Sequence, residues 1–275
     1  MPKQLKKMFN PSKVNHFGKL EMAFESRRGY TRLVHVYQQP PLKASRELYE
    51  GNHPAATVFI MESSGGMVAG DRNEITVTLA PDSQVKLKQQ SALKIYPSHN
   101  GEFCTQAITV ELAEQARLEW LPEVTIPFER AKFQVHTTIR MKESSTLIWG
   151  EIVAPGREMR GEIFDYQTFQ SKYKIYVEDT LIAYDSLQFK PQEMNFAEIG
   201  LLEKARYIGS LWIVSPSVNK LQIRDLQDQI QQEKSLQASV TKLTDQAIHC
   251  RWLAKEQRTL HKEINRMFEY IAALL

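Results

Sequence analysis

The pattern of hydrophobic and polar residues over the first two thirds of the chain is typical of strands with one buried face. Every second residue is hydrophobic from Ile75 to Leu79, a turn follows at Ala80–Ser83, and the alternation resumes over Val85–Lys88. Successive side chains of a strand point to opposite faces, so a spacing of two predicts strands. Because a short turn joins them, we expect these two strands to form a hairpin.

The same strand–turn–strand pattern returns three times, over residues 108–121, 137–149 and 174–184. The first two offsets, Ile75 to Ile108 and Ile108 to Ile139, are 33 and 31 residues. Repeats of this length indicate units that stack so that each covers the hydrophobic face of its neighbour, as in a β-solenoid. A β-sandwich whose hairpins look alike is the alternative, and both predict a mainly β fold.

After Phe189 the pattern changes. We expect one more strand over 206–214, a helix that begins at Ser215-Pro216, and a last helix from about Ala254 to the end. The residues expected to bury one face of this last helix are Leu260, Ile264, Met267, Phe268 and Ile271. We predict a single domain over 1–275, with a β-rich body over about 15–190 and a strand plus C-terminal helices over about 191–275.

Charge and composition exclude several classes of protein. The chain has 35 Lys and Arg against 32 Asp and Glu, which is too balanced to predict a nucleic-acid partner. No segment has the roughly 18 uncharged apolar residues of a membrane-spanning helix. Polar residues follow the basic start Met1–Lys7 at once, so no secretion signal is predicted and we expect a cytoplasmic protein. Cys104 and Cys250 are far apart, which favours reduced thiols.

Motifs of common enzymes are missing from the sequence. The glycine-rich stretch Ser63–Asp71 lacks the Gly-Lys-Ser/Thr ending of a phosphate-binding loop, so we interpret its glycines as residues of a tight turn. Neither a nucleophile elbow nor a helical pair of histidines is present. Glu119, Glu123 and Glu151 lie beside hydrophobic strand positions, as carboxylates do in carbohydrate-active β-solenoid enzymes. That enzyme class and a generic binding module remain the alternatives; we expect no catalytic residues.

A series of short segments resembles the UreD family of urease accessory proteins, called UreH in some organisms. In order, the segments are Gly18–Phe24, Arg28–Leu33, Pro41–Ala44, Gly65–Arg72, Gln90–Tyr96, Leu118–Glu123, Glu151–Arg157 and Gly161-Glu162. The motif residues within the two most specific segments are Gly65, Gly66, Gly70, Asp71, Arg72, Lys94 and Tyr96. Ser64, Ser91 and Leu93 depart from the family pattern, and the C-terminal third matches least.

The resemblance implies a mainly β stack of strands with C-terminal helices, and a non-catalytic scaffold. Such a scaffold binds UreF, UreG and apo-urease and assists nickel delivery to the urease active site. It implies no tightly bound cofactor, only nickel in transit. A conduit for nickel needs weakly binding oxygen or imidazole groups, because thiolates would trap the ion. The hypothesised transit residues are Asp71, His99, Glu119, Glu123 and Glu151.

Overall fold

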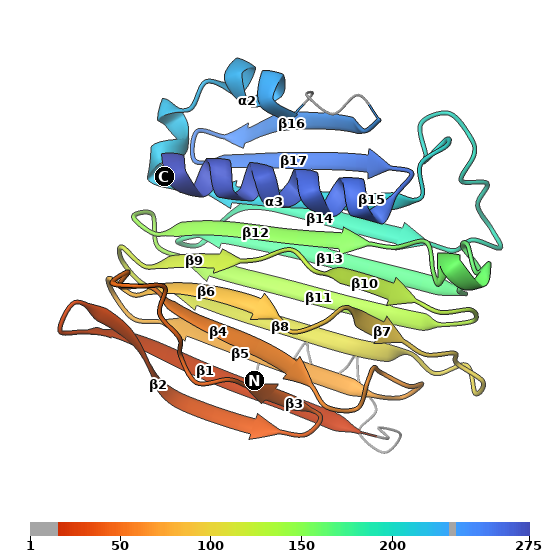
Figure 1. The fold of residues 1–275 in the computed structure, drawn as a ribbon, viewed down its shortest axis with the longest axis horizontal. Coiled ribbons are helices and arrows are strands. Elements are labelled where there is room, and N and C mark those ends of the chain that lie inside the picture. Colours follow the sequence, from red (N-terminus) through yellow and green to blue (C-terminus); the bar gives the residue numbers. More distant parts are fainter. Residues whose placement is uncertain (1–15, 231–234) are drawn as a thin grey trace.

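The computed structural model describes residues 16–230 and 235–275 as two β-sheets that face each other (Figure 1). The basic segment Met1–Lys7 lies outside the described residues. Sheet A has seven strands, in the spatial order β14, β13, β11, β8, β5, β1, β2. Their bounds are β1 (Phe17–Arg27), β2 (Tyr30–Gln39), β5 (Arg72–Leu79), β8 (Cys104–Leu112), β11 (Lys132–Met141), β13 (Thr168–Val177) and β14 (Thr180–Phe189).

Sheet B runs in the order β16, β17, β15, β12, β9, β6, β4, β3, and the short strands β10 and β7 are attached to it beside β12. The bounds are β3 (Leu42–Ala44), β4 (Ala56–Glu62), β6 (Gln84–Gln89), β7 (Leu93–Ile95), β9 (Arg117–Trp120), β10 (Val124–Pro127), β12 (Thr146–Val153), β15 (Tyr207–Val214), β16 (Gln237–Thr244) and β17 (Ala247–Ala254).

The chain alternates between the two sheets as it advances. Strands β5, β8 and β11 lie in sheet A, whereas the strands that directly follow them, β6, β9 and β12, lie in sheet B. Equivalent strands of successive repeats pair in parallel, β5 with β8 and β8 with β11 in sheet A, and β6 with β9 and β9 with β12 in sheet B. Each repeat is thus one coil of a flattened β-solenoid, which confirms the predicted fold class.

The predicted hairpins are wrong for the first three repeats and confirmed for the fourth. Of the four predicted strand pairs, only β13 and β14 pair antiparallel across their turn. Alternation identifies the buried face of a strand, but a hairpin and a step to a facing sheet both bury one face. The repeat offset is 33 residues between Ile75 and Ile108, as predicted, but Ile108 pairs with Thr137 instead of Ile139, so the second offset is 29 residues.

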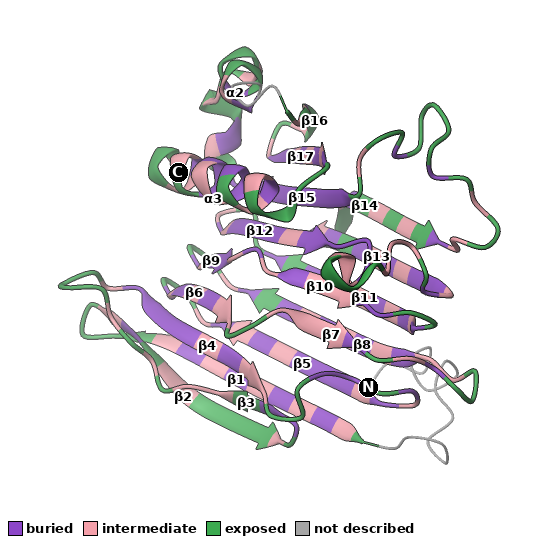
Figure 2. Ribbon diagram, turned by 45° about the vertical axis from the view of Figure 1, so that its right-hand side comes forward, coloured by how far each residue is buried: buried purple, intermediate pink, exposed green. Residues whose placement is uncertain are grey.

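The main hydrophobic core lies between the sheets, where buried and partly buried residues alternate along the strands (Figure 2). Large aromatic rings fill its middle: Trp120 stacks on Trp149 at 4.2 Å between centroids, and Tyr173 stacks on Trp212 at 4.4 Å. Stacked rings bury much apolar area at little cost in side-chain entropy, so this layer holds the two sheets together.

The helices pack on the outer face of sheet B. They are α2 (Ile223–Ile230), the 3₁₀ turn η3 (Pro216–Lys220) and α3 (Gln257–Leu274); a further 3₁₀ turn, η2, spans Glu158–Arg160. All five residues predicted for the inner face of the last helix are buried. Gly209 of β15 lets α3 come close, since a Cβ there would lie 2.2 Å from Ile264 Cδ1.

The region 191–275 contains three strands, where the sequence predicted one. The unpredicted pair, β16 and β17, is antiparallel. Strand β16 is mostly exposed at the sheet edge, so it lacks the alternation by which a half-buried strand is recognised. Strand β17 does alternate, with Ile248, Cys250, Trp252 and Ala254 buried and the positions between them partly buried, and the sequence prediction missed it. No helix in the described ranges is long and apolar enough to cross a membrane.

Candidate functional site: a polar passage between the sheets

One row of inward-facing positions is polar, although its neighbours are hydrophobic. In sheet A, Asn73 of β5 pairs in register with Gln106 of β8, and Ser171 of β13 lies two strands further along the same row. In sheet B, Glu151 of β12 pairs with Ser210 of β15, which pairs with Arg251 of β17. These rows run across the strands and place polar groups along much of the core, although in sheet A the hydrophobic Val135 of β11 lies between Gln106 and Ser171.

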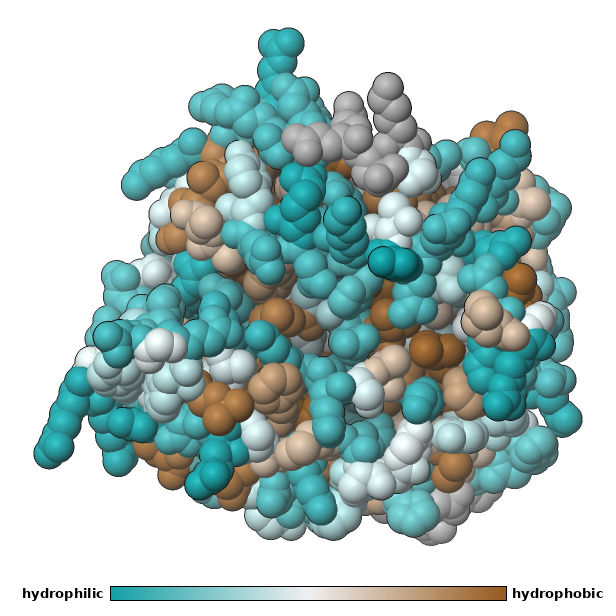
Figure 3. Space-filling view, viewed as in Figure 1, coloured by the Kyte–Doolittle hydropathy of each residue, from teal (hydrophilic) through white to brown (hydrophobic). Residues whose placement is uncertain are grey.

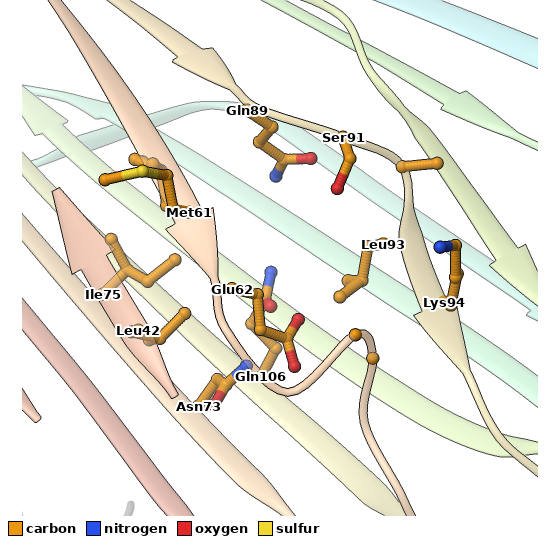
Figure 4. Close-up of a pocket in the computed structure, with 14 residues that line it drawn as sticks. Leu42, Met61, Glu62, Asn73, Ile75, Gln89, Ser91, Leu93, Lys94 and Gln106 are labelled. Atoms are coloured by element: carbon orange, nitrogen blue, oxygen red, sulfur yellow. The ribbon is translucent and has the colours of Figure 1, made fainter. Parts of the chain in front are cut away.

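The first of two cavities along this row, the outer cavity, lies beside the glycine-rich loop and has a volume of about 50 Å³. The polar side chains that line it are Glu62, Asn73, Gln89, Ser91, Lys94 and Gln106. In Figure 4, Glu62, Asn73, Gln89 and Gln106 extend from strands of both sheets toward the space between them, and Ser91 lies on the segment between β6 and β7. Ser91 and Gly65 are exposed, so the outer cavity reaches the surface.

The second cavity, the inner cavity, continues from the first. It has a volume of about 40 Å³ and shares Gln89, Leu93 and Gln106 with the outer cavity. Its other polar side chains are Glu123, Thr125, Glu151 and Tyr173, set among aromatic rings. Both volumes exceed the space that one water molecule needs. The two cavities together form a narrow polar path into the middle of the core.

An ion pair lies at the opposite side of the row. Arg251 Nη2 is 2.7 Å from Asp185 Oδ2 on the edge strand β14, and both side chains are about one quarter exposed. The row of paired positions from Glu151 through Ser210 to Arg251 thus ends at a charged pair at the opposite edge of the stack.

Several buried polar atoms along the row have no hydrogen-bond partner among the described residues. They are Asn73 Nδ2, Glu151 Oε1, Ser171 Oγ and Ser210 Oγ. Buried polar atoms are nearly always paired in folded proteins, because an unpaired one costs about 1–3 kcal/mol. Oxygen atoms with unused lone pairs are suited to hydrogen-bond water or a hydrated cation.

Glu151 is the most perturbed acid on this path. Its Oε2 accepts a hydrogen bond from the Tyr173 hydroxyl at 2.8 Å, and that hydroxyl accepts one from Trp149 Nε1 at 2.7 Å. Burial raises the pKa of Glu151 to about 7, although the hydrogen bond from Tyr173 and the charge of Arg251 oppose the shift. Burial also raises the pKa of Glu62, against a hydrogen bond from Ser64.

The glycine-rich loop forms the wall at the surface end. Met67 N donates to Lys94 O, and Tyr96 N donates to Met67 O, so the loop pairs with the segment that carries the second family motif. Gly66 has a φ of 145°. A Cβ on it would lie 2.6 Å from Lys94 O, so only glycine fits without a shift of the backbone. Asp71 closes the loop, because its Oδ2 accepts a hydrogen bond from Val68 N at 2.9 Å.

The structure brings together only two of the five hypothesised transit residues, Glu123 and Glu151, both at the inner cavity. Asp71 is buried in the loop and contacts His16 at 3.2 Å. His99 is exposed in a turn. Glu119 faces the outside of sheet B, where Arg117 pairs with it at 2.8 Å. Within the described ranges, no three His, Cys, Asp or Glu side chains form a metal-binding group.

Sequence reasoning missed Glu62, Asn73, Gln89, Gln106 and Tyr173 as lining residues. A signal for Gln106 was present: it occupies the inward phase of β8, where hydrophobic residues otherwise recur. Glu62 had no such signal, because it lies at the end of β4, where the alternation stops.

The fold and the two cavities define a flattened β-solenoid whose hydrophobic core contains a row of polar side chains, and comparison with known proteins gives its family. Residues 16–275 match the family described as UreD urease accessory protein.

Three curated relatives, each called urease accessory protein UreD, illustrate the similarity. The protein from Lysinibacillus sphaericus is 84% identical over 98% of this chain and 100% of its own length. That from Sporosarcina pasteurii is 38% identical over 91% of this chain and 98% of its own. That from Halalkalibacterium halodurans is 34% identical over 91% and 92%. The chain belongs to the UreD family of urease accessory proteins.

Proposed function

We propose that this chain is a non-catalytic scaffold for urease maturation that binds UreF, UreG and apo-urease, and that nickel moves toward urease through the passage between its sheets. The observation that carries the proposal is the row of buried polar side chains that crosses the core of a protein of this family. Such a row costs stability, and a mere structural spacer has no need of it.

The chemistry of the lining suits an ion that must move on. Carboxylates, amides and hydroxyls are oxygen ligands that bind a divalent ion weakly when they act singly. Glu62 lies at the outer cavity, and Glu123 and Glu151 lie at the inner one, so carboxyl groups are spaced at intervals along the path. Cys104 lies beside the loop, but burial raises its thiol pKa to about 12, which keeps it protonated and a poor trap for nickel.

A carbohydrate-active enzyme fits the structure less well. Glu123 and Glu151 line a cavity of about 40 Å³, far smaller than a site for a sugar ring. Glu119, the third carboxylate of that hypothesis, faces the other side of sheet B. A generic binding module explains neither the passage nor its buried carboxylates.

The proposal is tested by co-expression. The tagged chain is produced with UreF, UreG and the urease subunits, and the recovered partners and the nickel-dependent urease activity are measured with and without it. Recovery of UreF and apo-urease, together with loss of activity when the chain is omitted, is the expected result. Full activity without the chain and no recovered partner would overturn the proposal.

A further inference from the structure

Arg251 is a charged side chain on the inner face of sheet B. Charged residues are ordinary on the outside, where Figure 3 shows hydrophilic residues spread over the α3-bearing face. Along β17, Cys250 and Trp252 point outward and pack with residues of α3 in one hydrophobic cluster. Arg251 lies between them in the alternation, so it points inward, as His249 does where its ring stacks on Trp212. A permanent cation is thus built into the space between the sheets.

Two carboxyl groups from opposite sheets lie within reach of this guanidinium. Asp185 of β14 holds it in the structure, with its Oδ2 2.7 Å from Arg251 Nη2. Glu151 lies on the same face of sheet B as Arg251, two strands away, and the residue in register between them is Ser210. Two strand spacings amount to about 10 Å, which a long arginine and a glutamate can span together. Because serine is small, no bulky side chain of sheet B separates the two groups.

The charges of the ion pair already act on Glu151. Burial raises the pKa of this carboxyl; the hydrogen bond from Tyr173 and the charge of Arg251 oppose the shift, and the charge of Asp185 adds to it. Glu151 Oε1 is buried and has no hydrogen-bond partner among the described residues. Water screens charges poorly at such a site, so a cation bound at this oxygen and the guanidinium would repel each other.

The arrangement weakens the binding of a cation at the inner cavity without removing its ligands. A fixed arginine beside a passage is an electrostatic barrier to cations. Arg251 can also turn toward Glu151 and occupy the carboxylate itself, because a guanidinium has five N–H donors and one contact with Asp185 does not exhaust them. Asp185 limits this competition, since it attracts the same guanidinium toward the edge of the stack.

We infer that Arg251 acts through Glu151 to keep nickel from settling in the inner cavity: it competes with the ion for the carboxylate, and Asp185 determines how strongly it competes. The inference rests on the proposed function, because it takes nickel as the cargo from it. It adds the group that makes the inner cavity a place of transit instead of a storage site.

The test measures the affinity of the full chain for Ni²⁺ by equilibrium dialysis at one fixed pH. Arg251→Met with Asp185→Asn removes both charges of the pair, so the local net charge is unchanged while Glu151 is freed from the guanidinium. We expect this double variant to bind Ni²⁺ at least tenfold more tightly than the wild type. Asp185→Asn alone releases Arg251 toward Glu151, and we expect at least threefold weaker binding. An ion pair with a structural role only would not shift the two variants in opposite directions.

Two further variants locate the effect. Adding Glu151→Gln to the double variant is expected to abolish its gain in affinity; a gain that survives would place the ion elsewhere and overturn the inference. The matched control is Arg117→Met with Glu119→Gln, which removes an ion pair of 2.8 Å on the outer side of sheet B. The arginine side chains of the two pairs are similarly exposed, 20% for Arg117 and 22% for Arg251. The control is expected to bind Ni²⁺ within twofold of the wild type, and an equal gain in both would contradict the inference.

Failure of the inference and failure of the proposed passage give different results. If Glu123→Gln with Glu151→Gln weakens Ni²⁺ binding while the double variant at Arg251 and Asp185 binds no more tightly than the wild type, the inference fails and the passage stands. If neither the wild type nor any of these variants binds Ni²⁺, both fail.

Discussion

At the residue scale, the core of this protein contains polar and titratable groups that a purely structural solenoid would replace with hydrophobic ones. His249 is an example away from the passage lining. Its ring stacks on Trp212 at 4.6 Å, and its Nε2 has no partner among the described residues. Burial and the charge of Arg251 lower the pKa of His249 to about 4, so the folded protein favours the neutral imidazole.

This histidine predicts a loss of stability in acid. Its pKa is about 6.5 in the unfolded chain. The stability that the neutral ring contributes is therefore fully present above pH 6.5 and is lost as the pH falls toward and below 4. The loss reaches about 3 kcal/mol for a shift of this size. His249→Phe keeps a flat ring on Trp212 and removes the titration. Urea unfolding at pH 7.5 and 4.5 should show a smaller fall for the variant than for the wild type; equal falls would contradict the assignment.

Gly66 and Gly65 provide a matched pair for the geometry of the loop. Ala at position 66 meets Lys94 O and an unfavourable φ of 145°, and we expect it to lower the free energy of unfolding by about 3 kcal/mol. Ala at position 65 meets nothing within 4 Å, so only its φ of 78° counts, and the expected loss is about 1 kcal/mol. Urea denaturation of the two variants measures both losses. Equal losses would show that the contact with Lys94 is relaxed in solution.

At the element scale, single strands could be predicted from the sequence but their partners could not. The run from Ile75 to Leu79 identifies a strand and its buried face because alternation is a local property. Whether the next strand pairs with it or crosses to the other sheet depends on contacts that are distant in sequence. The same limit applied to the passage: Glu123 and Glu151 come together only because β12 pairs with β10, in which Val124 lies opposite Ile152.

The last helix is the element whose packing could be predicted most fully, since its hydrophobic spacing defines one face. Ile264 is fully buried against sheet B, and Ile264→Ala should cost about 2–5 kcal/mol through the cavity it leaves. Lys262→Ala on the exposed side of the same helix should change stability by less than about 0.5 kcal/mol. Thermal and urea unfolding give both values. A loss below about 1 kcal/mol for Ile264→Ala would mean that α3 is only loosely attached.

At the scale of the whole molecule, the two sheets differ in what packs on their outer faces. The C-terminal helices pack on sheet B, which has Glu123 and Glu151 on its inner side, while no α-helix of the described residues packs on the outer face of sheet A. The core between them is divided by a polar row that reaches from the glycine-rich loop toward the Arg251–Asp185 pair. In this account the functional part of the solenoid is the interior between its two sheets.

The most direct test of this account compares two sets of carboxylate substitutions in reconstituted activation of apo-urease. Glu123→Gln with Glu151→Gln removes both carboxyl groups of the inner cavity, whereas Glu119→Gln removes a nearby carboxyl group on the opposite side of sheet B. Nickel bound per urease site and urease activity are followed over time, at equal recovery of the complexes. We predict at least tenfold slower loading for the inner-cavity variant and wild-type loading for Glu119→Gln. Equal loading by all three proteins would contradict a route for nickel between the sheets.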